Sequence, residues 1–126
     1  MSTVLATVCL AANLFSCAPA EVRVVDGDTI SLGREKIRIV GIDAPEMKGA
    51  CTNEIVLARA AKAKLAELLG GRTIVIAREG RDRYRRTLAR VEADGRDVGK
   101  VLMAEGLARK WVKNWRPGLD DVWCPR

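Results

Sequence analysis

Apolar and polar residues alternate over residues 22–32, and an Asp-Gly pair at 26–27 interrupts the alternation. This pattern predicts two short strands joined by a tight turn. A Gly-Arg pair at 33–34 marks a second turn, and the β-branched run KIRIVGI at 36–42 predicts a third strand. Pro45 ends this strand, because proline has no N–H to donate to a neighbouring strand.

The period of the pattern changes at Asn53, which is a favourable helix N-cap residue. Residues 54–69 are rich in helix formers, and their apolar members recur at helical spacing. The predicted buried stripe consists of Ala58, Ala61, Leu65 and Leu68. A Gly-Gly pair at 70–71 stands where helices commonly end.

The rest of the chain adds two strands and a second helix. Strands are predicted over 72–77 and 84–93, a turn at 94–95, and a helix over 98–106 that Asp97 can cap. Five short strands, with one helix after the third and another after the fifth, predict an α+β fold built on an OB-type five-stranded Greek-key barrel. A doubly wound sheet would need strands and helices that alternate.

The first twenty residues carry no charge, and their apolar stretch ends in the small residues of 18–20. This is typical of a secretory signal peptide, so we expect a leader over 1–20 and a folded domain over 21–126, secreted or periplasmic. A buried N-terminal helix or strand is the alternative, because no basic residues precede the stretch. LFSC partly resembles a lipoprotein acylation site at Cys17. The stretch is too short to span a bilayer comfortably, so no transmembrane segment is expected.

Net charge and the absence of histidine restrict the function. A net charge of +6 favours an anionic partner, with nucleic acid as the first candidate, although a basic protein tuned for solubility would also have it. The lack of histidine excludes histidine general bases, Ser-His-Asp triads, Cys-His pairs and Cys/His zinc fingers. Acid–base chemistry must therefore use carboxylates, Lys, Tyr or a metal-bound water.

Without the predicted leader, the cysteines that remain are Cys51 and Cys124, which lack the CxxC spacing of a zinc or redox site. In an oxidising compartment we expect them to form one disulfide, worth on the order of 4 kcal/mol in the chain-entropy model. A pair of free thiols is the alternative.

Charged residues stand at the ends of the first, third and fifth predicted strands, which a barrel can bring to one rim. Asp28 and Asp43 offer hard oxygens that suit Ca²⁺ or Mg²⁺, and Glu46 could orient a metal-bound water or take its proton. Arg38 and Arg86 would donate to phosphate oxygens as negative charge builds on them. Each residue taken alone also has an ordinary interpretation, as a turn former or a solvated surface charge.

Four motifs occur in order along the chain, with the first predicted helix between the second and the third: VVDGDTI, RIVGIDAPE, DRYRRTLA and ADGRDVGKVLMAEGLA. Over about Val24 to Ala108 the chain resembles the staphylococcal nuclease family. The resemblance implies an OB-fold barrel and cleavage of phosphodiester bonds in DNA and RNA that depends on Ca²⁺, for which another divalent cation could substitute.

The resemblance also implies a role for each residue that matches a motif position. These are Asp28, Asp43 and the carbonyl of Ala44 as metal ligands, Glu46 as general base or water-orienting group, Arg38 and Arg86 on the phosphate, and Tyr84 at the substrate. Arg85, the neighbour of Arg86, is also predicted to contact the substrate. Arg85 stands where the family usually has glycine, so a positive φ there would strain the turn. The chain ends soon after Trp115, and a disulfide from Cys124 to Cys51 could pin this short tail.

Two other functions stay open at this point. The barrel could bind single-stranded nucleic acid without chemistry, or serve as a structural domain of the cell envelope. The carboxylates favour an enzyme, because a pure binder of a polyanion has little use for them, and the scarcity of aromatic residues before Trp111 argues against a stacking surface. We expect DNA or RNA as substrate, no stable protein partner, and a monomer.

Overall fold

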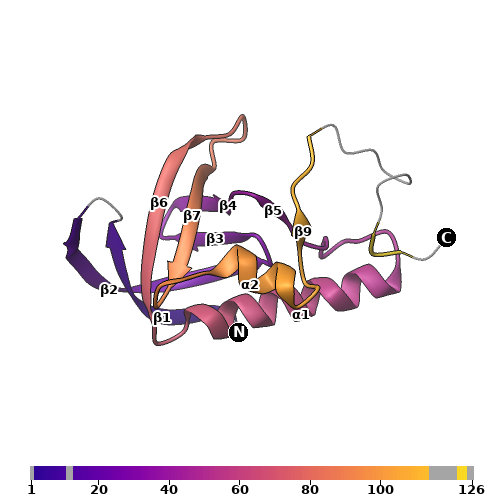
Figure 1. Ribbon diagram of the computed structural model, residues 1–126, viewed down its shortest axis with the longest axis horizontal. Helices are drawn as coiled ribbons and strands as arrows, with labels where there is room; N and C mark the ends of the chain where they lie inside the picture. The colour runs from indigo at the N-terminus through magenta and orange to yellow at the C-terminus, as the bar shows by residue number, and fades with distance from the viewer. Residues whose placement is uncertain (1, 11–12, 114–121, 125–126) are drawn as a thin grey trace.

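Six strands close into a barrel in the computed structural model, which describes residues 2–10, 13–113 and 122–124 (Figure 1). They follow one another around the barrel in the order β4-β3-β2-β1-β6-β7, and β4 pairs in parallel with β7 to close it. The bounds are β1 Thr3–Leu10, β2 Asn13–Asp26, β3 Thr29–Leu32, β4 Glu35–Ile39, β6 Thr73–Arg81 and β7 Thr87–Ala93.

Two helices and three short strands complete the described chain. Helix α1 runs along one end of the barrel, and α2 lies beside it (Figure 1). Strand β5 pairs with β9, and β8 extends the edge at β7. Their bounds are α1 Thr52–Leu69, α2 Val98–Ala104, β5 Ile42–Asp43, β8 Arg96–Asp97 and β9 Arg109–Lys110. The five predicted strands correspond to the second half of β2 and to β3, β4, β6 and β7, so the predicted barrel with two helices is confirmed.

Strand β1 is the part of the barrel that the five-strand prediction lacks. It lies between β2, which it pairs with antiparallel, and β6, which it pairs with in parallel over residues 7–10 and 73–76. A disulfide joins Cys9 of β1 to Cys17 of β2. Residues 3–10 and 13–20 of the segment predicted as a leader thus lie in strands of the full chain. Cleavage after residue 20 stays a prediction, because strand pairing does not report on processing.

The barrel interior is filled by β-branched residues that alternate along the strands. Six of the fully buried ones are Val22, Val24, Ile30, Ile37, Ile74 and Ile76. Helix α1 closes the lower end in Figure 1 with one apolar face. Its buried residues include Ala58, Ala61, Leu65 and Leu69, while Leu68 is only partly buried. The predicted stripe is therefore confirmed for its first three members, and Leu69 takes the place of Leu68.

The start of α1 differs from the prediction. The helix begins at Thr52 with Cys51 as its N-cap residue, and no side chain caps it there. Asn53 lies inside the first turn, and its side-chain amide instead donates to the carbonyl of Trp123 at 2.6 Å. The N-cap prediction for Asn53 is wrong, because a contact with the C-terminal segment, invisible to local propensity, uses that side chain.

Two further boundaries differ. The predicted third strand is divided, because Gly41 adopts φ +85° and turns the chain between β4 and β5. Asp97 caps α2 as predicted, accepting the N–H of Lys100 at 3.1 Å, but the helix ends at Ala104 and Gly106 follows with φ +73°. Neither helix in the described part of the chain is long and apolar enough to cross a membrane.

Candidate active site

Gly27 brings the turn between β2 and β3 into close contact with α1 and with the chain after β5. A Cβ at this position would lie 2.7 Å from Cβ of Ala61 and 2.8 Å from Cβ of Ala44, so only glycine fits against two alanines. The approach lets the backbone N–H of Ala44 donate to Oδ2 of Asp28 at 2.9 Å. Oδ1 of Asp28 accepts the hydroxyl of Thr29 at 3.1 Å. The buried carboxylate is thereby held in one orientation.

Arg38 joins the two predicted metal carboxylates. Its Nη2 lies 3.3 Å from Oδ2 of Asp28 and 3.7 Å from Oδ1 of Asp43. Its Nη1 donates to the backbone carbonyls of Ile39 at 2.6 Å and Ile42 at 3.0 Å. The turn at Gly41 makes the second contact feasible, since it folds Ile42 back toward the guanidinium. The structure therefore brings Asp28, Arg38 and Asp43 together.

Asp43 has a second cationic neighbour that sequence reasoning missed. Arg109 of β9 stands opposite Asp43 in the β5–β9 pair, and its Nε and Nη2 each lie 3.3 Å from Oδ2 of Asp43. The two residues are 66 positions apart in the sequence. Strand β9 has only two residues, too few for a periodic pattern, so the local sequence does not predict the strand or its contact with Asp43.

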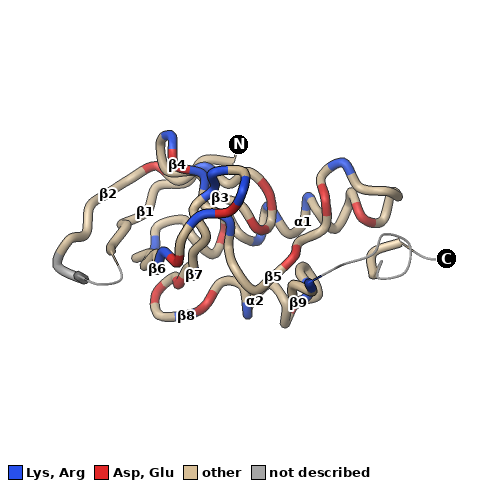
Figure 2. The backbone as a smooth tube through the Cα atoms, turned by 90° about the horizontal axis from the view of Figure 1, so that it is seen from above, with Lys and Arg blue, Asp and Glu red and all other residues tan. Residues whose placement is uncertain are grey.

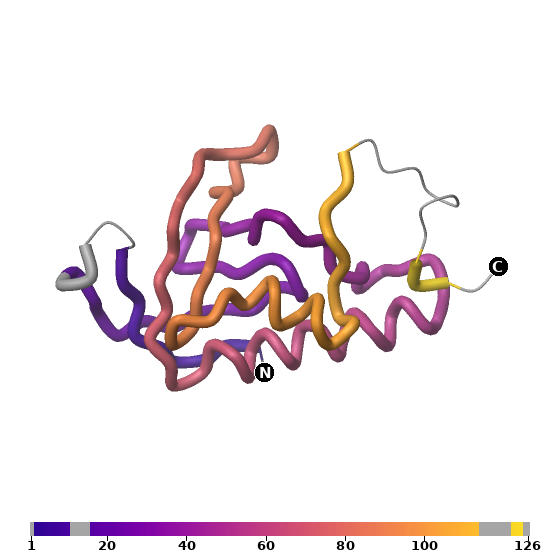
Figure 3. The backbone as a smooth tube through the Cα atoms, in the orientation of Figure 1, coloured from indigo at the N-terminus to yellow at the C-terminus, as the bar shows by residue number. Residues whose placement is uncertain are grey.

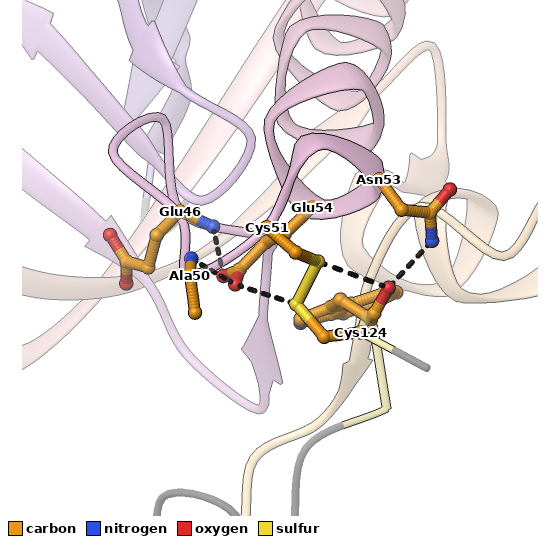
Figure 4. The surroundings of a disulfide bond; sticks show 7 residues. Glu46, Ala50, Cys51, Asn53, Glu54 and Cys124 are labelled. Carbon is orange, nitrogen blue, oxygen red and sulfur yellow. Dashed lines mark hydrogen bonds between the residues drawn. A yellow bond between two sulfur atoms is a disulfide. The ribbon is translucent and has the colours of Figure 1, made fainter. Parts of the chain in front are cut away.

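Glu46 lies on the exposed loop after Pro45, and within the described ranges no hydrogen bond reaches its carboxylate. Partial burial raises the pKa of this carboxyl above its ordinary value, and the negative charges of Asp28 and Asp43 raise it further. Figure 4 shows the Glu46 side chain turned away from the start of α1. The charge of Glu46 therefore interacts with the charges of Asp28 and Asp43, although no hydrogen bond within the described ranges links their side chains to it.

Asp26 is a fourth carboxylate at this rim. Its Oδ1 accepts the backbone N–H of Asp28 at 3.1 Å. Burial, followed by the side chain of Asp28, raises the pKa of Asp26 to about 7. Burial and the neighbouring carboxylate therefore favour a proton on Asp26.

The hairpin between β6 and β7 carries the remaining predicted residues. Asp82 organises it by accepting the backbone N–H groups of Tyr84 and Arg86, each at 2.9 Å, and Nε of Arg86 at 2.7 Å. The guanidinium of Arg86 lies 5.6 Å from the centroid of the Tyr84 ring. In Figure 2 basic positions gather along this hairpin, which holds Arg81, Arg83, Arg85 and Arg86.

Arg85 adopts φ +65°, a left-handed conformation that glycine takes without strain and that costs free energy for other residues. Its side chain is exposed. The pocket next to the hairpin is lined by Arg86 and not by Arg85. Of the two neighbouring arginines, Arg86 is therefore the one that shares a pocket with Arg38.

That pocket, of about 530 Å³, links the strand end at Arg38 to the hairpin. Its lining includes Arg38, Gly41, Tyr84, Arg86, Leu88 and Trp111. Trp111 was not predicted as a site residue; its backbone N–H donates to the carbonyl of Gly41 at 3.0 Å, and its ring is about half exposed. The pocket thus presents three arginines, Arg38, Arg83 and Arg86, and two aromatic rings, and Arg38 also contacts Asp28 and Asp43.

The donor set can be compared with the metal predicted from sequence. Across the described ranges, no group of three or more Cys, Asp or Glu side chains lies close enough to hold a metal ion alone. Asp28 and Asp43 do lie close to the same nitrogen, Nη2 of Arg38, and the backbone N–H of Ala44 donates to Asp28. Two carboxylates and a backbone carbonyl are hard donors, which fit Ca²⁺ or Mg²⁺ with water completing the shell.

Comparison with known proteins identifies the family of the chain. The family model described as "Staphylococcal nuclease homologue" matches residues 36–121, more than half of the chain. The chain belongs to the staphylococcal nuclease family. The predicted family is confirmed, and the matched residues contain Arg38, Asp43 and Glu46 as well as the β6–β7 hairpin.

Individual relatives share about a third of their aligned residues with the chain. An "Uncharacterized endonuclease" of Escherichia coli is 38% identical over 99 residues, covering 72% of this chain and 58% of that protein. One of Haemophilus influenzae is 33% identical, with 69% and 48% covered. The "Thermonuclease" of Staphylococcus intermedius is 34% identical, with 69% and 55% covered. The chain therefore spans about half the length of the curated relatives it matches.

Proposed function

We propose that the chain is a nuclease that hydrolyses phosphodiester bonds in DNA, RNA or both. The observation that carries the proposal is Arg38, which lies between Asp28 and Asp43 and lines the pocket shared with Arg86. Carboxylates repel the phosphates of a polyanion unless they bind a cation or take part in proton transfer. The combination of carboxylates and arginines at one site therefore favours catalysis over binding alone. Membership of the family and relatives named endonuclease and thermonuclease support the same activity.

Asp28, Asp43 and the carbonyl of Ala44 would hold Ca²⁺, or another divalent cation of the same preference. The bound ion would polarise the phosphate and lower the pKa of a coordinated water. Arg38 would then exchange its carboxylate partners for phosphate oxygens. Its Nη1 contacts with the carbonyls of Ile39 and Ile42 would keep the guanidinium in place during that exchange.

Glu46 is the proposed general base. Its carboxylate is exposed and turned away from α1, so a water molecule can reach it (Figure 4). The raised pKa of the carboxyl brings it nearer to neutrality, where a base accepts a proton more effectively. As the water attacks phosphorus, Glu46 takes its proton, and Arg38 and Arg86 donate to the phosphate oxygens on which charge builds. One ester P–O bond breaks, and the departing sugar oxygen takes a proton from solvent.

Substrate binding is assigned to the pocket and the hairpin. Tyr84 and Trp111 offer aromatic faces on which bases can stack, and stacking tolerates any base. Arg85 projects from the exposed turn and is proposed to contact a phosphate outside the pocket. The free energy of such a contact would offset the strain of its positive φ.

The test is cleavage by the full chain, with its disulfides oxidised, of single-stranded DNA, double-stranded DNA and RNA, with Ca²⁺ or a chelator. We expect Ca²⁺-dependent cleavage that Glu46→Gln lowers by at least 10²-fold while binding to the same substrate persists. Glu92→Gln, an exposed glutamate on β7, is the matched control and should keep full activity. Salt-sensitive binding without cleavage would instead support the single-strand binding module.

We also infer that the protein works in an oxidising compartment, secreted or periplasmic. Two disulfides, Cys9–Cys17 and Cys51–Cys124, support this, because such bridges persist mainly outside the cytosol. A leader over 1–20 and acylation at Cys17 remain predictions. Either of them would remove the Cys9–Cys17 bridge from the mature protein, because one or both cysteines would be cleaved off or modified. The intact mass of the exported protein, measured without reductant, distinguishes a start at Met1, Cys17 or Glu21.

A further inference from the structure

Glu54 is a buried carboxylate with no place in the proposed chemistry. It is 8% exposed and occupies the third position of α1. Its Oε2 accepts the backbone N–H of Glu46 and its Oε1 accepts that of Ala50, both at 3.0 Å (Figure 4). A glutamate at this position commonly reaches back to the N-cap N–H. Here it reaches further, to the loop that carries the proposed base.

Gly49 shows how tightly that loop encloses Glu54. A Cβ at position 49 would lie 2.6 Å from Cγ and 2.7 Å from Cδ of Glu54. The backbone of residues 46–50 therefore passes directly over the glutamate side chain. Loop and carboxylate form one packed unit, and a change on either side displaces the other.

The disulfide between Cys51 and Cys124 adjoins this unit (Figure 4). Cys51 is the N-cap residue of α1, and Sγ of Cys124 lies 3.8 Å from Oε1 of Glu54. Asn53 binds the carbonyl of Trp123 from the same turn. Figure 3 shows the C-terminal segment beside the start of α1. The bridge thus fixes the turn from which Glu54 reaches the loop.

We propose that Glu54 is a positioning residue for Glu46, and that the Cys51–Cys124 bridge holds Glu54 in the orientation this requires. The proposal rests on the catalytic role proposed for Glu46. Two charge-assisted hydrogen bonds fix both ends of a five-residue loop, so the exposed base keeps a defined place although no hydrogen bond from the described residues holds its own carboxylate.

The first experiment compares Glu54→Gln with Glu67→Gln, an exposed glutamate on the same helix. Glutamine keeps the shape but turns an amide donor toward one of the two N–H groups. We expect Glu54→Gln to lower kcat by roughly 10- to 100-fold with KM changed by less than about threefold, and Glu67→Gln to change neither. Backbone amide exchange at Glu46 and Ala50 should accelerate in Glu54→Gln alone. Gly49→Ala, which disturbs the same packing from the loop, should reproduce both effects.

The second experiment tests whether Glu54 acts through Glu46. In a Glu46→Gln background, adding Glu54→Gln should lower the residual rate by less than about twofold, because the group it positions is already gone. An equal further loss would assign Glu54 a general role in folding and overturn the proposal. Unchanged kcat and unchanged amide exchange in Glu54→Gln would overturn it as well.

The third experiment removes the bridge. The Cys51→Ser/Cys124→Ser variant should accelerate amide exchange at Glu46 and lower kcat. Cys9→Ser/Cys17→Ser removes the bridge between β1 and β2, strands that lie far from the start of α1 in Figure 1, and should leave both unchanged. Equal effects of the two double variants would overturn the role of the bridge. Full activity of Glu46→Gln would reject the proposed base, while the exchange data would still report on the loop. The two failures are therefore distinguishable.

Discussion

Nη2 of Arg38 lies 3.3 Å from Oδ2 of Asp28, so one guanidinium joins the turn after β2 to the end of β4. The same side chain also reaches Asp43 and two backbone carbonyls. Both carboxylates need their counterion, and both carbonyls need a donor. Arg38 supplies all of these from one planar group, which a lysine ammonium cannot imitate.

Arg38→Lys should therefore damage both stability and activity. We expect the free energy of unfolding to fall by about 2 kcal/mol, since several partners of a largely buried guanidinium lose their donors. The cleavage rate should fall about 10²-fold, because one charged donor to the phosphate is misplaced. Urea denaturation and single-turnover cleavage measure the two effects. Arg90→Lys, at an exposed ion pair with Glu79, is the control and should change neither by more than a small margin.

Arg85→Gly should raise the free energy of unfolding, whereas Arg38→Lys should lower it. Glycine adopts φ +65° without strain, so the variant should be more stable by about 1 kcal/mol. It should also bind polynucleotide more weakly, with the salt dependence of binding reduced by about one phosphate contact. Arg83→Gly is the comparison, because Arg83 has a negative φ and glycine there should lower stability. A less stable Arg85→Gly variant would contradict the strain at this turn.

Sequence reasoning succeeded where the signal was local. The alternating strands, the stop at Gly70-Gly71 and the cap at Asp97 each follow from a few neighbouring residues, and the barrel follows from their order. The closeness of Asp28, Arg38 and Asp43 was expected from barrel topology, and the structure brings them together. The catalytic roles of these residues remain a proposal.

The features that the sequence did not reveal depend on contacts between distant segments. Arg109 contacts Asp43 because the two-residue strand β9 pairs with β5. The side chain of Asn53 donates to the carbonyl of Trp123 and does not cap α1 as predicted. Glu54 looked like an ordinary residue of a helix first turn. The N–H groups that Glu54 binds become known only from the path of the loop, which passes over the Glu54 side chain at Gly49.

The pKa of Asp26 predicts how stability depends on pH in the metal-free protein. The pKa rises from an ordinary 3.8 to about 7 on folding, so the folded state binds more protons between these values. Stability from this group is therefore full below about pH 4, falls as pH rises through the window, and is constant above pH 7. Asp26→Asn should remove this slope and raise stability at pH 8 by an amount on the order of 2 kcal/mol, allowing for screening by solvent.

Urea denaturation of both proteins at pH 4.5 and pH 8 measures the difference. The two proteins should converge at the lower pH and separate at the higher one. Glu92→Gln, an exposed carboxylate on β7, controls for the loss of one negative charge. Parallel stability curves for Asp26→Asn and the parent would show that Asp26 does not hold its proton in the folded state.

Deletion of residues 1–20 tests the place of β1 in the barrel. Strand β1 separates β2 from β6 and buries Ala6 and Cys9, so its loss should uncover the edge of β6 at Ile74 and Ile76. We expect residues 21–126 to unfold at least 10 °C below the full chain, since about 2 kcal/mol or more of burial and strand pairing disappears.

The comparison needs both proteins with the Cys51–Cys124 bridge intact, followed by circular dichroism during heating. Cys9→Ser/Cys17→Ser in the full chain is the control, because it keeps β1 but removes the bridge between the two strands. Equal melting temperatures for the full chain and residues 21–126 would mean that β2 can pair with β6 directly. That behaviour is the one expected if residues 1–20 are a removable leader.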